Sequence, residues 1–155
     1  IENAELWIAG DGPKKAEYLA LTQDLKLENK VKFIGKLLPE KLREITRKAD
    51  VGLSIEENNG LSYYFSMPNK VSDYIQARIP VVVSDFPEMR KVVDHFQAGE
   101  KIRNYDELAD KVKIVLENGK SFYENPLNKA ADELCWENEE PKIVNLFKKV
   151  VKENF

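Results

Sequence analysis

The residues best suited to chemistry lie between two apolar segments, 51–55 and 79–83. Lys70 and Asp73 are three positions apart in segment 68–78, whose apolar residues recur at helical spacing, so both would lie on one helix face. One interpretation is that they form an exposed ion pair and nothing more, although lysine ahead of an acid is the less favourable order for such a pair. Alternatively, Lys70 lies beside a bound phosphate and Asp73 accepts hydrogen bonds from sugar hydroxyls.

The two apolar segments are the elements that would position these side chains. Both are short, rich in β-branched residues and without clean alternation, which is typical of strands buried on both faces of a parallel sheet. Segment 68–78 would be the helix that connects them, with Pro68 suited to its first turn. The start of that helix should open onto the carboxyl ends of the strands, where α/β proteins bind ligands and free N–H groups favour phosphate.

The loop from Glu57 to Met67 is longer than most strand-to-helix connections, and such loops are often functional. Glu57, Gly60 and Tyr64 are therefore candidate ligand contacts. The alternative is a mobile surface loop, but the three adjacent aromatic residues at 63–65 are seldom left fully in water. They could equally cover a domain interface.

Strand and helix patterns alternate through most of the chain, which predicts an α/β fold. We expect a Rossmann-like parallel sheet of about five strands with helices on both faces. C-terminal helices should run from about 105 to 155, interrupted by an irregular segment at Asn125 and Pro126. With 155 residues and 43% hydrophobic content, the chain can build a single domain, 1–155. The expected strands are 5–9, 31–35, 51–55, 79–83 and 98–102.

Gly10 and Gly12 form a Gly-x-Gly turn after the first expected strand, and Gly35 ends the second. The turn is not a dinucleotide fingerprint, because the third glycine would fall at Lys15. We expect mainly a tight turn, with a ligand-lining role as the alternative.

Composition excludes several classes of function. The net charge is −3, with 24 basic and 27 acidic residues interspersed, which argues against a nucleic-acid surface or a basic membrane face. One cysteine and one histidine, Cys135 and His95, leave no disulfide framework and no Cys/His metal cluster. No apolar run approaches the ~20 residues that span a bilayer. We therefore expect a cytoplasmic protein with no transmembrane segment and no nucleic-acid partner.

Several motifs, in this order and spacing, resemble the C-terminal domain of GT-B glycosyltransferases of family 4. Trp136 and Glu137 are similar to the closing helices of that family, so the resemblance covers most of the chain. The motifs are Leu-Trp-Ile-Ala-Gly-Asp-Gly-Pro at 6–13, the strand 31–35, Ala-Asp-Val at 49–51, Pro-Asn-Lys at 68–70 with Asp-Tyr at 73–74, Pro-Val-Val-Val-Ser-Asp at 80–85 and Pro-Glu-Met at 87–89.

The resemblance implies a domain that binds a nucleotide-sugar donor, a UDP- or GDP-sugar, without a metal or other cofactor. The acceptor would lie mainly on a separate N-terminal domain, and the pair would act as a hexosyltransferase in glycan biosynthesis. That missing domain could bring the protein to a membrane surface. The donor-binding residues would be Gly10, Gly12, Gly35, Asn69, Lys70, Val71 and Asp73.

Individual roles follow from the same resemblance. Lys70 would lie beside the diphosphate, Gly35 would let the base approach, and Asp73 would take the place of the family's ribose-binding glutamate. The first of the family's two glutamates, which contacts the donor sugar, aligns with Phe65, so that contact is missing or supplied differently. Arg78 replaces the family's usual glycine at the end of this helix.

The resemblance also implies that the chain begins after the family's first strand-helix unit, which carries basic contacts to the diphosphate. The complete strand order, 3-2-1-4-5-6, would then become 2-1-3-4-5 if the gap closes. Alternatively, a second copy could fill the gap by strand pairing. In either case we expect the isolated chain to be inactive.

Two other functions stay open on the sequence. A sugar-nucleotide 2-epimerase shares the two-domain architecture but would need a catalytic histidine, and the chain offers only His95. A non-catalytic flavodoxin-like binding module would be favoured by acids at the strand ends, but Asp50 lies at the wrong end of its strand.

Overall fold

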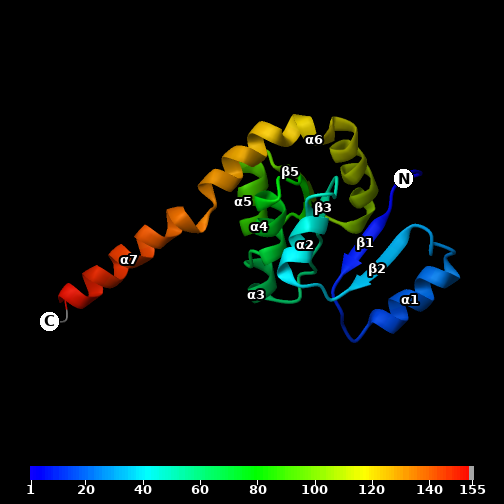
Figure 1. Cartoon of the computed structure of the whole chain (residues 1–155), viewed down its shortest axis with the longest axis horizontal. Coiled ribbons are helices and arrows are strands. Elements are labelled where there is room, and N and C mark those ends of the chain that lie inside the picture. The colour runs from blue at the N-terminus through cyan, green and yellow to red at the C-terminus, as the bar shows by residue number, and fades with distance from the viewer. Residues whose placement is uncertain (154–155) are drawn as a thin grey trace. The chain divides into compact units, whose positions relative to one another are not determined.

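A computed structural model describes residues 1–153 and divides the chain into two compact units (Figure 1). Unit 1 is Ile1–Ile45, and unit 2 begins at Thr46.

Unit 1 is built on two parallel strands. Strands β1 (Leu6–Ala9) and β2 (Val31–Gly35) pair with Leu6 opposite Val31, and helix α1 (Lys15–Asp24) connects them. Helix α2 (Pro39–Thr46) follows β2. Within unit 1, all of whose residues the structure describes, Thr22 alone is buried, so this unit has little interior of its own.

Unit 2 contains a three-stranded parallel sheet of order β3-β4-β5, with Gly52 opposite Val81 and Val81 opposite Gly99. Its elements in chain order are β3 (Gly52–Ser54), α3 (Leu61–Tyr64), α4 (Asn69–Gln76), β4 (Val81–Ser84), α5 (Pro87–Phe96), β5 (Gly99–Ile102), a 3₁₀ turn (Tyr105–Glu107), α6 (Leu108–Glu133) and α7 (Trp136–Glu153).

The core of unit 2 forms around β4. Its three valines, Val81 to Val83, are fully buried, as expected for a central strand whose β-branched side chains pack on both faces. Helices α4, α5 and α6 each supply buried apolar residues to the same core: Val71 and Ile75, Met89 and Val93, and Val115 and Leu127, respectively.

The expected α/β class is confirmed, and all five expected strands are present and parallel. They form two sheets, β1-β2 and β3-β4-β5. Each sheet keeps the neighbours of the expected order 2-1-3-4-5, while the pairing of β1 with β3 that one continuous sheet requires is not among the strand pairings of residues 1–153.

The prediction of an irregular segment at Asn125 and Pro126 is wrong. Helix α6 continues through Pro126, and its break lies at Gly119, whose backbone adopts φ 72° and ψ 165°. The apolar stripe of Tyr123 and Leu127 is buried across the proline, so packing outweighs the lost helical hydrogen bond.

Arg78, just after the end of α4, has a backbone conformation that usually requires glycine. Its backbone has φ 62°, in the left-handed region that favours glycine. The arginine side chain is held by hydrogen bonds to Asn128 Oδ1 and to the Gln76 carbonyl, both at 2.9 Å. These contacts offset part of the conformational cost.

Gly99 is expected to tolerate no side chain. A Cβ added there would lie 1.9 Å from the carbonyl oxygen of Val81, and its φ of +154° is unfavourable for other residues. We predict that Gly99→Ala lowers the free energy of unfolding, measured by urea denaturation, by about 3 kcal/mol. Gly12→Ala is the matched control, because a Cβ at Gly12 meets nothing within 4 Å. Equal losses in the two variants would contradict this account of the β4–β5 contact.

Candidate functional site

A hollow of about 370 Å³ lies at the carboxyl ends of the three strands of unit 2. Because parallel strands end at the same edge of a sheet, the residues that follow β3, β4 and β5 meet there. We call it the strand-end hollow; its lining is formed by residues 55–58, 84–86 and 102–105, together with Tyr64.

Ser84, the last residue of β4, fixes one wall of the strand-end hollow. Its side chain is buried, and its hydroxyl makes two short hydrogen bonds to the backbone of Glu56. The Glu56 N–H donates to Ser84 Oγ at 2.7 Å, and Ser84 Oγ donates to the Glu56 carbonyl at 2.8 Å. The chain that leaves β3 is thereby tied to the end of β4.

Lys70 reaches this edge from the first turn of α4. Its Nζ lies 2.7 Å from Glu56 Oε1, and the two side chains are 46% and 23% exposed. The exposed ion pair between Lys70 and Asp73 is therefore not formed. Asp73 is exposed on α4 and makes no ion pair within the part of the chain that the structure describes.

Two further polar groups lie beside Glu56. Tyr105 donates a hydrogen bond from its hydroxyl to Glu57 Oε1 at 3.2 Å. Partial desolvation of the ring, and after it the Glu57 and Glu56 carboxylates, raise the pKa of Tyr105 above its ordinary value. Asp85, at the end of β4, is instead neutralised by Arg90 at 2.6 Å.

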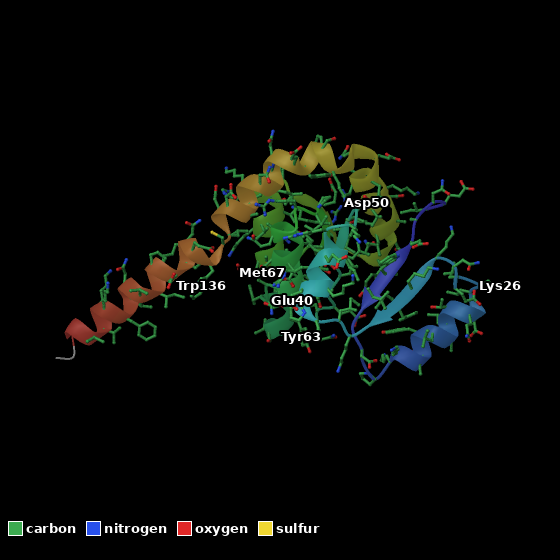
Figure 2. The ribbon with its side chains drawn as sticks, viewed as in Figure 1. Lys26, Glu40, Asp50, Tyr63, Met67 and Trp136 are labelled. Carbon is green, nitrogen blue, oxygen red and sulfur yellow. The ribbon has the colours of Figure 1, made fainter. Side chains whose placement is uncertain are left out.

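The loop before α4 is partly ordered by aromatic packing. Tyr64 is half-buried, lines the strand-end hollow and packs against Phe65 and Phe86, with ring centroids 5.0 and 5.2 Å apart. Tyr63 and Phe65 remain exposed, and Figure 2 labels Tyr63. Gly60 stands at the start of α3 with φ +137° and is not part of the lining.

The predicted residues thus fall into two groups, one in each unit. In unit 1, the Gly10 N–H donates to the Gly35 carbonyl at 2.8 Å, which joins the ends of β1 and β2, and Gly12 lies two residues on. In unit 2, Asn69, Lys70, Val71 and Asp73 begin α4. Val71 is fully buried, and its N–H donates to the Pro68 carbonyl at 3.0 Å, so this residue is not exposed to a ligand.

Sequence reasoning missed Glu56, Ser84 and Tyr105. The first two follow directly on apolar strand segments, a position that could have identified them. Tyr105 meets Glu57 from 48 residues away, and no local pattern signals that contact.

Two kinds of feature are absent from residues 1–153, which the structure describes. No group of three or more His, Cys, Asp and Glu side chains there is arranged to hold a metal ion. No helix in this range has both the length and the apolar character needed to cross a membrane.

A family model described as "Glycosyl transferases group 1" matches residues 1–118. No curated protein matches the chain.

Three solved structures share the fold, which is that of GT-B glycosyltransferases. Sucrose-phosphate synthase from Thermosynechococcus elongatus has a TM-score of 0.78 at 17% identity, over 99% of this chain and 40% of that one. AviGT4, a glycosyltransferase involved in avilamycin A biosynthesis, has a TM-score of 0.67 at 15% identity, over 96% of this chain and 44% of that one. WaaG, a glycosyltransferase involved in lipopolysaccharide biosynthesis, has a TM-score of 0.64 at 16% identity, over 84% of this chain and 34% of that one. The chain therefore spans less than half the length of each.

The link between Tyr105 and Glu57 predicts a measurable titration. Because the Glu57 carboxylate disfavours the tyrosinate, Glu57→Gln should lower the pKa of Tyr105 part of the way toward the ordinary tyrosine value, while desolvation, the larger cause, and the Glu56 carboxylate keep it raised. The check is a ¹³C NMR titration of the tyrosine ring in wild type and variant. Asp106→Asn is the control, because Asp106 is next to Tyr105 in sequence but does not contribute to its shift. An unchanged titration in Glu57→Gln would contradict the contact.

Proposed function

Because the chain belongs to the family of group 1 glycosyl transferases, we propose that it is the donor-binding part of a glycosyltransferase. Its donor is a nucleotide-sugar, a UDP- or GDP-sugar. Together with an N-terminal acceptor-binding domain it transfers a hexose to an acceptor in glycan biosynthesis, and without that domain it is inactive.

The observation that carries this proposal is the position of Lys70. Its ammonium lies at the carboxyl end of a parallel sheet, beside a hollow lined by polar groups, and α4 begins at the same edge. This is where α/β proteins bind phosphate-bearing ligands. Since Glu56 uses one of the three donors of the ammonium, the others stay available to a second anion.

Transfer of a sugar from its nucleotide leaves a diphosphate with increased negative charge. Lys70 and the first amide groups of α4 stabilise that charge, because a fixed ammonium and helix N–H groups favour an anion without reorganisation. Pro68 at the N-cap offers no side-chain cap, which leaves the amides of Asn69 and Lys70 to a ligand. We propose that these groups, rather than a metal ion, balance the diphosphate.

The remaining predicted contacts concern the nucleoside and the sugar. Asp73 accepts hydrogen bonds from the ribose hydroxyls, and its exposed carboxylate supports this role. Gly35 lets the base approach the end of β2, with the turn at Gly10 and Gly12 as a further contact. Glu57 and Tyr64, which line the strand-end hollow, lie toward the sugar. A cytoplasmic location and the absence of a nucleic-acid partner stay predictions.

The role of Lys70 predicts a loss of affinity. Lys70→Ala should weaken the binding of UDP or GDP about tenfold, the effect of one charge-assisted hydrogen bond to phosphate. Isothermal titration calorimetry at low ionic strength measures it. Lys111→Ala is the matched control, since Lys111 lies 2.8 Å from Glu100 in a similar ion pair of unit 2. If both variants bind like wild type, Lys70 is not the diphosphate contact.

The role of Asp73 predicts selectivity for the nucleoside. Asp73→Ala should weaken the binding of UDP or GDP about tenfold, on the order of one lost hydrogen bond to a charged group. Affinity for inorganic diphosphate should not fall, because that ligand has no ribose. A calorimetric titration in which the nucleotide affinity of Asp73→Ala equals that of wild type would count against the ribose contact.

A further inference from the structure

Glu56 is a charged residue at the strand-end hollow whose backbone and carboxylate both make hydrogen bonds. Its backbone is bound on both sides by Ser84, through the N–H at 2.7 Å and the carbonyl at 2.8 Å. Its Oε1 accepts from Lys70 at 2.7 Å, with the buried Ser54 Oγ at 3.4 Å. Its Oε2 has no hydrogen-bond partner among the residues that the structure describes, and Glu56 lines the hollow.

The other half of the pair is fixed as well. Lys70 stands on α4 next to Val71, which is fully buried, and Ile75 anchors the next turn. The ion pair therefore joins a helix that is packed in the core to a loop that is hydrogen-bonded to β4. A ligand that binds the Lys70 ammonium in this position lies close to the Glu56 carboxylate, because the two groups are 2.7 Å apart.

We infer that Glu56 is a specificity-determining residue that disfavours a bare nucleoside diphosphate relative to a nucleotide-sugar. This inference rests on the proposed function. A bare diphosphate brings negative charge to Lys70 and offers no hydroxyl donor to Glu56, so the two anions repel each other. A nucleotide-sugar carries less charge on its diphosphate, and its sugar hydroxyls can donate to the free Oε2.

The consequence for the reaction is a bias against the product. Once the sugar has been transferred, the remaining nucleoside diphosphate loses the hydroxyl donors and gains charge, so Glu56 favours its release. The site then returns to the ligand-free arrangement seen in the structure, in which Lys70 pairs with Glu56.

The test compares Glu56→Gln with wild type by calorimetry, using UDP against UDP-glucose and GDP against GDP-mannose. The variant should bind the nucleoside diphosphate about tenfold more tightly, the scale expected for removing one like charge in a partly exposed site. Binding of the nucleotide-sugar should stay the same or weaken. The ratio of the two dissociation constants should thus shift at least about tenfold in favour of the nucleoside diphosphate.

Glu100→Gln is the matched control, because Glu100 pairs with Lys111 at 2.8 Å with comparable exposure and lies outside the lining of the hollow. It removes the same charge and should leave the ratio unchanged. Ser84→Ala provides a second route, because it keeps the Glu56 charge but releases its backbone, and it should shift the ratio in the same direction by a smaller factor. Circular dichroism confirms that each variant is folded.

The outcomes separate the two levels of the proposal. If wild type binds nucleotides and Glu56→Gln changes both ligands equally, or Glu100→Gln shifts the ratio as much, the inference on Glu56 is wrong and the proposed function stands. If folded wild type binds neither nucleoside diphosphates nor their sugars, the proposed function fails and the inference fails with it.

Discussion

The burial of strand β4 is the constraint on which the rest of unit 2 depends. Hydrogen bonds to β3 and β5 occupy both of its edges, and its three valines are fully buried beneath α4, α5 and α6. Burial continues to the last residue, Ser84, whose hydroxyl cannot remain without a partner. The backbone of Glu56 satisfies it. Core packing thus determines where the chain after β3 must lie, and with it the wall of the strand-end hollow.

The same packing fixes the charged groups of the site. Val71 and Ile75 hold α4 in the core, so Lys70 projects from a rigid first turn and reaches Glu56, which is rigid for a different reason. The ion pair with Glu56 places the Lys70 ammonium at the strand ends before any ligand binds. The start of α4 and the loop after β3 therefore bring Lys70 and Glu56 together as one charged pair.

Much of this fold follows from the sequence alone. The β-branched segments and the glycine and proline positions predict the five strands and the start of α4, because both signals are local. Where a longer-range effect prevails, the prediction fails. The partner of Lys70 is Glu56 rather than Asp73, since helical spacing describes neighbours within one element and not across a loop. Burial of Tyr123 and Leu127 carries α6 through Pro126, and hydrogen bonds from the side chain of Arg78 support a backbone conformation usually reserved for glycine. Tyr105 joins the site through a contact that only the folded chain contains.

The central claim is that the strand ends of unit 2 bind the diphosphate of a sugar donor. A ¹H–¹⁵N NMR titration of the chain with UDP and with GDP tests it most directly. The account predicts saturable shifts of the amides of Asn69 and Lys70 and of those of Glu56 and Tyr105, with one nucleotide preferred. A folded chain in which these amides do not respond to either nucleotide, or respond less than those of the distant helix α7, would contradict it.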